Sequence, residues 1–235
     1  MNEKEYLIAV STFSYFGPAR IKLLISYFKS AQKLWESSST KLRDVGLSEK
    51  KIKEYSEHRA RFDMNLYSRK LSELKIKTTT FLDNDFPNIL NGLEDAPVIL
   101  YYKGFLKSLK KNTVAIVGSR KMTSYGRKVC EKFARELSHY KITIVSGLAR
   151  GVDTVAHKAV LREGGTTVAI LGNGLDRVYP PENKSLAEEI VEKGGAVISE
   201  FPLGTPPLPT NFAVRNRIIS GLSGAVVVIE GAVKS

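Results

Sequence analysis

From residue 113 onward, short runs of apolar residues alternate with longer stretches in which apolar residues recur every three or four positions. Recurrence at three and four is the pattern of a helix with one buried face, whereas fully apolar runs are typical of strands buried on both faces of a parallel sheet. The runs that predict strands are 114–117, 142–146, 167–171, 196–199 and 225–229. The stretches that predict helices lie near 124–139, 152–163, 183–193 and 211–222. This alternation predicts an α/β fold with a Rossmann-like, doubly wound and mostly parallel sheet.

The same region predicts helix faces and helix ends at single positions. In 124–139, the four-residue spacing of Val129, Phe133 and Leu137 places them on the expected buried face. The pairs Gly164-Gly165 and Gly194-Gly195 stand where two helices should end. Glycine is the residue that most readily ends a helix in a left-handed cap.

Residues 1–75 show almost no β pattern and predict a small all-α domain. A first helix stops at Gly17-Pro18, and Pro18 suits the first turn of the next helix because that position needs no N–H. Ser48 is the expected N-cap after the turn that contains Gly46. The expected core residues of this domain are Phe13, Phe28 and Trp35.

Short helices joined by tight turns resemble the helix-hairpin-helix and sterile-alpha-motif (SAM) modules. The glycine turns of such a module either contact a DNA backbone or simply connect the helices, and we favour the second interpretation. Residues 76–111 come next as a connector in which 78–82 and 98–102 are β-branched and aromatic. We expect these two strands at the side of the main sheet, so the predicted divisions are 1–75, 76–111 and 112–235.

The excess of basic over acidic residues indicates what kind of partner the chain binds. The chain has 36 Lys and Arg against 24 Asp and Glu, a formal net charge of +12. The excess is shared, with 15 basic and 9 acidic residues in 1–75 and 17 and 11 in 111–235. Such a balance suits a polyanionic partner, and it also occurs as ordinary solvated surface.

A single cysteine excludes an intramolecular disulfide, and Cys130 falls among apolar neighbours as an expected core residue. The polar N-terminus lacks the apolar core of a signal peptide, and no apolar run reaches transmembrane length. We therefore expect a cytoplasmic protein with no membrane partner.

Glycines and basic residues come directly after the predicted strands, and the carboxyl ends of parallel strands meet at one edge of a sheet. Glycine lets backbone N–H groups approach a ligand, and helix N-termini favour anions. Several cations at one edge suit a run of phosphates, while Tyr179, Phe201 and Phe212 are expected to stack bases. The candidate phosphate-binding residues are Gly118, Ser119, Arg120, Ser146, Gly147, Arg150, Gly151, Gly172, Gly174, Lys184, Arg215, Asn216 and Arg217.

Several enzymatic patterns are absent from the sequence. The Gly-x-Gly-x-x-Gly dinucleotide fingerprint and the Gly-Lys-Ser/Thr phosphate loop do not occur. Three histidines and one cysteine provide no metal-ligand spacing and no Ser-His-Asp arrangement. We therefore predict no catalytic residue, no metal site and no cofactor.

Two pairs of residues, Asp153 with His157 and Glu200 with Glu230, each allow two interpretations. Asp153 and His157 share a helix face, either as an acid–base pair or as a hydrogen-bond network that holds the turn 147–151, which we favour. Glu200 and Glu230 stand at strand ends, where a carboxylate acts as a catalytic group or orients arginines. We favour orientation for both.

Several motifs taken together resemble the DNA-processing protein A (Smf) family. They are Ala115-Ile-Val-Gly-Ser-Arg120, Ser146-Gly-Leu-Ala-Arg-Gly-Val-Asp-Thr-Val-Ala-His157, Thr167-Val-Ala-Ile-Leu-Gly-Asn-Gly-Leu-Asp176, Tyr179-Pro180, Ser199-Glu200 and Arg215-Asn-Arg217. The resemblance implies a bacterial cytoplasmic protein that binds and protects incoming single-stranded DNA in natural transformation and loads the RecA recombinase onto it. It further implies no catalysis, a homodimer in the full-length form, and Arg120 and Lys184 as principal DNA contacts. Arg150, Arg215 and Arg217 are then expected in the same pocket.

The family normally continues beyond the segment that matches residues 230–235 with a further helix and strands. The resemblance therefore implies a sheet domain that is incomplete at its C-terminus, without the part that contributes to dimerisation and recombinase contact. The alternative function is a nucleotide-binding Rossmann-like enzyme of the nucleoside monophosphate glycosidase type. Those enzymes use a Pro-Gly-Gly-x-Gly-Thr loop followed by glutamate, which this sequence lacks.

Overall fold

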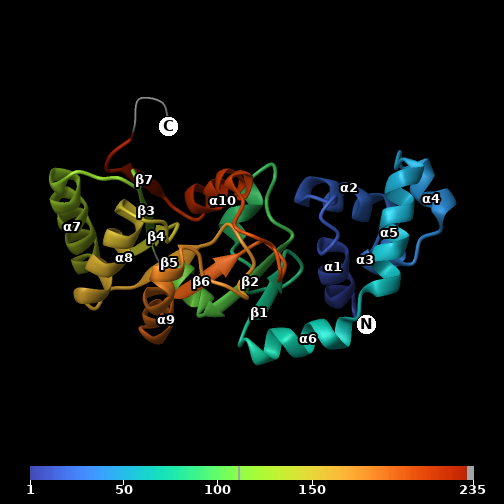
Figure 1. Cartoon of the computed structure of the whole chain (residues 1–235), viewed down its shortest axis with the longest axis horizontal. Helices are drawn as coiled ribbons and strands as arrows, with labels where there is room; N and C mark the ends of the chain where they lie inside the picture. The colour runs from blue at the N-terminus through green and yellow to red at the C-terminus, as the bar shows by residue number, and fades with distance from the viewer. Residues whose placement is uncertain (111, 232–235) are drawn as a thin grey trace.

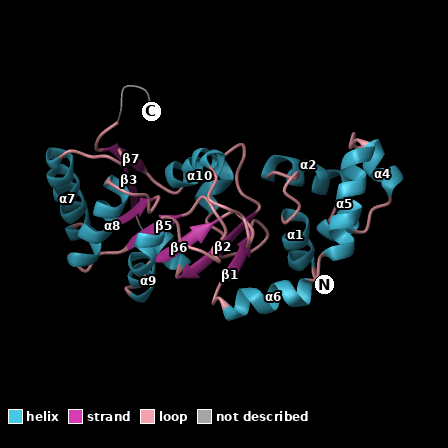
Figure 2. Cartoon of the chain, viewed as in Figure 1, coloured by secondary structure: helices cyan, strands magenta, loops and turns pink. Residues whose placement is uncertain are grey.

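The computed structural model describes residues 1–110 and 112–231 of the chain. The incompleteness expected at the C-terminus concerns the segment 230–235, of which 232–235 lie outside the described residues. Helices fill the N-terminal part, and a sheet with helices on both faces fills the rest (Figure 1). In Figure 2 the N-terminal part consists of helices and loops, and the strands lie together in the rest of the chain.

Six short helices make up the N-terminal part, and their ends have the predicted chemistry. They are α1 (Glu3–Ser11), α2 (Pro18–Phe28), α3 (Ala31–Trp35), α4 (Ser39–Asp44), α5 (Glu49–Arg61) and α6 (Met64–Glu73). Pro18 opens α2 as predicted, and Ser48 Oγ accepts a hydrogen bond from Lys51 N as the N-cap of α5. Phe13 and Phe28 are buried in the core as predicted, while Trp35 is half-buried at its edge.

Within the described residues, seven strands form one sheet in the order β1-β2-β6-β5-β4-β3-β7. They are β1 (Lys77–Thr80), β2 (Ile99–Gly104), β3 (Thr113–Val117), β4 (Thr143–Ser146), β5 (Thr167–Ile170), β6 (Ala196–Ser199) and β7 (Ala225–Val228). Across the sheet from β6 to β7 every pairing is parallel, and β2 pairs with β6 and β1 in antiparallel fashion. The predicted parallel sheet with two strands added at its side is confirmed.

Helices cover both faces of this sheet. The helices after β3, β4, β5 and β6 are α7 (Ser124–His139), α8 (Val152–Arg162), α9 (Lys184–Glu192) and α10 (Pro209–Gly221), and the short 3-10 helices are η1 (Asn88–Gly92), η2 (Leu106–Lys110) and η3 (Pro181–Asn183). Ile116 and Ile144 pack with α7 and α8, whereas Ala115 and Val145 pack with α10 on the other face. Figure 1 shows α10 and α9 on opposite sides of the strands.

The buried face of α7 differs from the prediction. Its buried residues are Gly126, Cys130, Ala134 and Ser138, whereas Phe133 is 42% exposed. Val129 and Leu137 are half-buried beside that face. Small residues at four-residue spacing let α7 lie close to α8, so large side chains remain at the margin. The predicted left-handed caps are confirmed, since Gly164 has φ 66° and Gly194 has φ 83°.

The helical part and the sheet share one hydrophobic cluster. Residues of α1, α2 and α5 belong to the same cluster as Tyr101 of β2 and Ile190 of α9. Tyr67 of α6 donates to Tyr101 Oη over 3.2 Å and accepts from Leu203 N over 3.1 Å. The loop from β6 to α10 is therefore supported by the helical part.

Candidate functional site

The order of the strands places one crevice at the carboxyl end of β3. β3 lies between β4 and β7, so the chain leaves β3 toward one side and returns from α10 on the other. Open parallel sheets bind ligands at such a reversal of strand order, outside the carboxyl ends of the strands. The segments after β3, β4 and β5, together with α10, line this crevice.

The turn 147–151 comes directly after β4 and has an unusual backbone. Leu148 is fully buried with a left-handed φ of 58°, and Gly151 has φ 79° at a point where a Cβ would clash with Ser119 O. Asp153 Oδ2 accepts a hydrogen bond from Ala149 N over 3.2 Å, and Asn183 Nδ2 donates to Leu148 O over 2.8 Å. Backbone of this kind persists only where its surroundings hold it.

Arg215 of α10 is buried behind this turn. Its Nη1 donates to Gly147 O over 2.8 Å and also to Ile170 O, and only 4% of the residue is exposed. Burial lowers the pKa of Arg215 to about 10, although the nearby Asp153 favours the charged form. Burial raises the pKa of Asp153, and Arg215 opposes that rise. The Nε of Arg215 has no hydrogen-bond partner among the described residues.

Two adjoining cavities, which we call the arginine hollow, open in front of Arg215. The inner one, of about 20 Å³, holds little more than one water molecule, while the outer one measures about 610 Å³. Both are lined by Arg120, Ala149, Phe212 and Arg215. The inner cavity adds Gly147, Arg150, Tyr179 and Pro180, and the outer adds residues that include Gly118, Asp153, Asn216 and Arg217.

Aromatic rings and arginines meet in this hollow. The rings of Tyr179 and Phe212 lie 5.6 Å apart at 31°, and the Arg120 guanidinium lies 5.4 Å from the centre of the Phe212 ring. A Cβ at Gly172 would stand 2.8 Å from the Phe212 ring, so this glycine lets the ring lie close to the end of β5. Arg120 is exposed, and no acidic side chain in residues 1–110 or 112–231 forms an ion pair with it.

Arg217, another of the predicted cations, lies in a different setting. Its Nη2 and Nε pair with Glu200 Oε2 and Asp95 Oδ2, each over 2.6 Å, so this guanidinium is held by carboxylates at the rim. Glu200 therefore orients an arginine, the interpretation favoured from the sequence. Arg215 and Arg217 point apart because residues two positions apart on a helix do not share a face.

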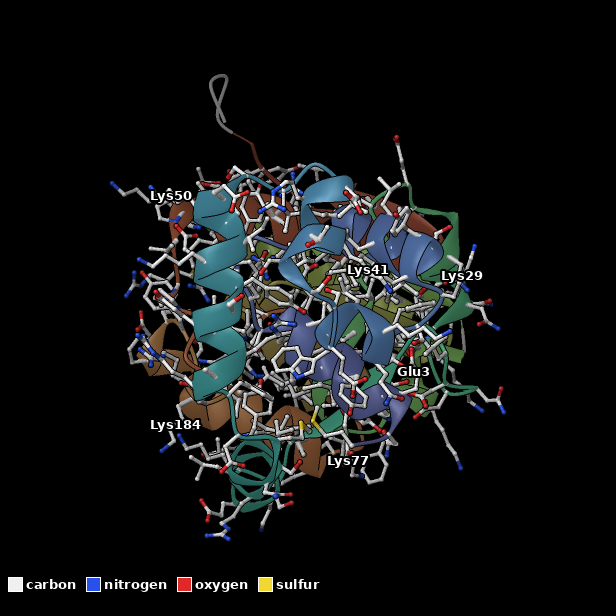
Figure 3. All side chains as sticks on the ribbon, turned by 90° about the vertical axis from the view of Figure 1, so that its right-hand side faces the viewer. Glu3, Lys29, Lys41, Lys50, Lys77 and Lys184 are labelled. Atoms are coloured by element: carbon white, nitrogen blue, oxygen red, sulfur yellow. The ribbon has the colours of Figure 1, made fainter. Side chains whose placement is uncertain are left out.

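Lys184 lies outside the arginine hollow. It is exposed at the start of α9 and lines another cavity with Lys103, Asp176 and Glu188. Figure 3 shows Lys184 directed outward, and it shows Lys29, Lys41 and Lys50 spread over the helical part rather than gathered. Phe201 lines a third cavity, between the helical part and the loop before α10, and does not accompany Phe212.

Backbone N–H groups of the turns that were expected to bind phosphate donate hydrogen bonds to carbonyl oxygens of the protein instead. Ser119 N donates to Glu230 O over 2.8 Å, Val152 N to Ser119 O over 3.2 Å, and Gly174 N to Thr205 O over 3.0 Å. Ser146 Oγ donates to Ile116 O over 2.6 Å and is buried. The close approach that these glycines permit is to other protein atoms, so the side chains of the arginine hollow carry its positive charge.

His157 does not belong to the network that holds the turn 147–151. Its Nδ1 hydrogen-bonds Thr167 Oγ1 over 2.7 Å, and Thr167 Oγ1 donates to Ile144 O, so His157 ties α8 to β5 and β4. Burial lowers its pKa to about 3. The expected hydrogen-bond network of Asp153 and His157 is therefore wrong for His157. Of the two residues, only Asp153 holds the turn 147–151, by accepting from Ala149 N. Cys130 is buried as predicted, and burial raises the pKa of its thiol to about 12.

Glu230 hydrogen-bonds the N-terminal end of α7 and does not pair with an arginine within the described residues. Its carboxylate accepts from Thr123 N over 2.8 Å and from Thr123 Oγ1, and Thr123 is the N-cap of α7. Its side chain also lies against Gly126, where a Cβ would clash with it. The sequence-based interpretation of Glu230 as an arginine partner is therefore wrong.

Sequence reasoning missed two residues that shape the hollow. Glu182 pairs with Arg150, which lines the inner cavity, and Asn183 donates to Leu148 O and to Thr154 Oγ1, each over 2.8 Å. Both lie in the segment 179–183, where the sequence prediction rested on the aromatic Tyr179 and on the lysine after Asn183. An acidic residue beside a predicted row of cations is a signal that could have identified Glu182.

Two further observations concern membrane-spanning helices and metal-binding clusters in the described residues. None of the helices in residues 1–110 and 112–231 has the length and apolar composition needed to cross a membrane. In the same ranges, no three side chains of His, Cys, Asp or Glu come together in a way that would hold a metal ion.

Comparison with known proteins points to one group of relatives. Residues 77–235 match the family model described as DNA recombination-mediator protein A. Protein Smf of Synechocystis is 37% identical over the whole chain, and the chain spans 60% of that protein and about half the length of other curated relatives. The crystal structure of DNA processing protein A from Streptococcus pneumoniae superposes with a TM-score of 0.81 at 36% identity, covering 100% of this chain and 81% of that one.

A second solved structure comes from Helicobacter pylori. It is a DNA processing protein A reported for its single-stranded DNA binding mode, and it superposes with a TM-score of 0.60 at 33% identity. The match covers 68% of this chain and 72% of that one. The family model, for its part, spans the whole sheet on which the arginine hollow is built.

Proposed function

The chain belongs to the DNA recombination-mediator protein A family, and from that premise we propose that it binds single-stranded DNA in the arginine hollow. The observation that carries the proposal is the position of Arg120, an exposed guanidinium without a carboxylate partner in the described residues, stacked on Phe212. A charge in that state is available to a phosphate, and the ring beside it is available to a base.

The cations of the hollow support a chain of phosphates as the ligand. Arg120 and Arg150 are exposed at its mouth, and Arg215 adds a positive charge from behind the turn 147–151. Phosphate contacts supply most of the affinity of proteins that bind nucleic acid without regard to sequence. A row of arginines therefore favours a polyanion over a single small anion.

The aromatic pair supports a single strand over a duplex. Tyr179 and Phe212 are half-buried and lie at the cavity rather than in the core. Stacking on such rings requires bases whose faces are open, and a duplex keeps those faces covered. The sequence-tolerant nature of stacking also fits a protein that accepts any strand.

The wider role is inferred from family membership. We infer that the bound strand is protected during natural transformation and that the RecA recombinase is loaded onto it, in the bacterial cytoplasm and with a homodimer as the full-length form. The relatives that are named as DNA processing proteins support this role. We also infer that the chain is not an enzyme, since Glu200 is bound on both oxygens by Arg217.

Fluorescence anisotropy with labelled oligothymidine and a duplex of equal length, across a series of salt concentrations, tests the proposal. We expect tighter binding of the single strand, with the logarithm of affinity falling by roughly 0.7 per phosphate contact for each tenfold rise in salt. Equal or tighter binding of the duplex, or an affinity independent of salt, contradicts it.

A further inference from the structure

Arg150, which lines the inner cavity of the arginine hollow, forms an ion pair with Glu182. Arg150 Nε donates to Glu182 Oε1, and the two side chains remain 58% and 50% exposed. Arg150 comes from the turn after β4, and Glu182 comes from η3 after β5, 32 positions further along the chain. The pair therefore joins the turn that contributes Arg150 to the inner cavity with the segment that contributes Tyr179 and Pro180.

Arg150 differs in this respect from the other arginines at the edge of the sheet. Arg120 has no carboxylate partner in the described residues, and Arg215 is buried with its Nη1 on two carbonyl oxygens. Arg217 is held by Glu200 and Asp95 at the rim. Arg150 alone among these four is both exposed at the inner cavity and neutralised by a carboxylate from another loop.

We propose, on the basis of the proposed function, that Glu182 determines the anion selectivity of the hollow by competing with phosphate for Arg150. An incoming phosphate must take the place of the Glu182 carboxylate. A ligand that reaches only Arg150 gains little from that exchange, because one anion replaces another. A strand that also contacts Arg120 and stacks on Phe212 gains enough elsewhere to complete it.

The exposure of the pair makes this exchange feasible. Ion pairs between solvent-exposed side chains contribute little to stability, because water screens the charges and both side chains lose conformational freedom. A phosphate offers a planar guanidinium two acceptor oxygens at once, which a single Nε–Oε1 contact does not. Glu182 therefore sets a threshold for binding rather than blocking the hollow.

The chain offers a matched control for the test. Glu189 and Lys193 of α9 form an exposed ion pair of the same kind, 3.1 Å long and 45% and 47% exposed. Glu189→Gln changes the net charge as Glu182→Gln does and breaks one surface pair, but its partner Lys193 does not line the hollow, whereas Arg150, the partner of Glu182, does. Binding of oligothymidine and of inorganic tripolyphosphate is measured for the parent, Glu182→Gln, Glu189→Gln, Arg150→Ala and the double variant Arg150→Ala/Glu182→Gln.

We expect Glu182→Gln to bind oligothymidine about two- to fivefold more tightly than the parent. Its salt dependence should stay the same, because the bound strand contacts Arg150 through a phosphate in both proteins. Glu189→Gln should leave both quantities unchanged, and in the Arg150→Ala background Glu182→Gln should give no more than Glu189→Gln does. No gain from Glu182→Gln, or an equal gain with Arg150 removed, overturns the proposal.

Tripolyphosphate separates this proposal from the proposed function. A parent that does not bind oligothymidine contradicts the proposed function alone. If Glu182→Gln then binds tripolyphosphate more tightly than the parent, and only when Arg150 is present, the competition is supported. Equal binding by the two proteins, or no binding by either, overturns it.

Discussion

The guanidinium of Arg215 lies directly against the backbone of Gly147. Nη1 of Arg215 donates to Gly147 O over 2.8 Å, and a Cβ added to Gly147 would stand 2.5 Å from Nη1 and 2.7 Å from Cζ. The position of the Arg215 guanidinium and the backbone of the turn 147–151 therefore depend on each other. Glycine is required at 147 because the arginine occupies the space of a side chain.

Loss of Arg215 should strongly destabilise the protein. Arg215→Ala removes two hydrogen bonds to carbonyl oxygens and takes from the buried Asp153 a cation that favours its charged form. Breaking a buried charge arrangement costs about 3 kcal/mol or more of the free energy of unfolding. Urea denaturation measures the effect, and Arg127→Ala, an exposed arginine of α7, serves as the control. A loss below about 1 kcal/mol contradicts this account of Arg215.

Gly147→Ala should destabilise the protein through the same contact. The added methyl group must displace the guanidinium, so the cost should shrink in the Arg215→Ala background, as coupled residues show in double-mutant cycles. Gly92→Ala is the control, because a Cβ there meets no atom within 4 Å. Additive costs for Gly147→Ala and Arg215→Ala would show that the two residues are independent.

Stability should fall on acidification because of His157. Burial, and to a lesser extent Arg215, lower the pKa of His157 from 6.5 to about 3 in the folded protein. Between these values the unfolded chain takes up a proton that the folded protein does not, so stability is lost as the pH falls below about 6.5. The loss from this group should be about 2 kcal/mol between pH 7 and pH 5.

Comparison with His157→Gln isolates that effect, because Asp153 and Glu200, whose pKa values are raised by burial, titrate in both proteins. Urea denaturation at pH 7 and pH 5 should show a smaller loss in the variant by about the same 2 kcal/mol. An equal loss in parent and variant contradicts the neutral buried state of His157.

The strands and helices of the sheet region could be predicted from sequence because each apolar run and each glycine cap agrees with the global fold. The helix predicted over 124–139 is found as Ser124–His139. The buried face of this helix was predicted wrongly, because the residues that it buries are the small ones Gly126, Cys130, Ala134 and Ser138. Hydrophobic periodicity weights large side chains, whereas close helix packing selects small ones.

The candidate site could be predicted only in part, for a geometric reason. The sequence indicates which cations come after strands but not which way each side chain points or which carboxylate it meets. Arg120, Arg150 and Arg215 line one cavity, whereas Lys184 lines another and Arg217 is paired with Glu200. Asp95 and Glu182 lie 122 and 32 positions from their partners Arg217 and Arg150, so the sequence does not show which arginine each carboxylate meets.

The aromatic contribution can be separated from the electrostatic one. Phe212→Leu keeps an apolar side chain of similar reach beside Gly172 but removes the ring that faces Tyr179 and Arg120. Loss of a stacking platform costs about 1–3 kcal/mol, so affinity for oligothymidine should fall about 5- to 150-fold with an unchanged salt slope. Phe201→Leu, in the cavity beside the helical part, should have no effect. Equal effects of the two variants would place stacking elsewhere.

Catalysis of base release should be absent. Both carboxylate oxygens of Glu200 accept from Arg217, so this carboxylate is held as the partner of an arginine. We expect purified protein to release no base from nucleoside monophosphates and no phosphate from ATP. Chromatography of the reaction products checks this, and base release that disappears in Glu200→Gln would favour the glycosidase alternative.

The most direct test of the central claim is the affinity of Arg120→Ala for labelled oligothymidine at moderate salt. Arg120 is exposed, so its loss should leave the thermal midpoint unchanged while binding weakens about tenfold or more, as expected for a charged phosphate contact. Lys184→Ala, in the separate cavity, should weaken binding to a smaller extent. If Arg120→Ala binds as tightly as the parent, the arginine hollow is not where the strand binds.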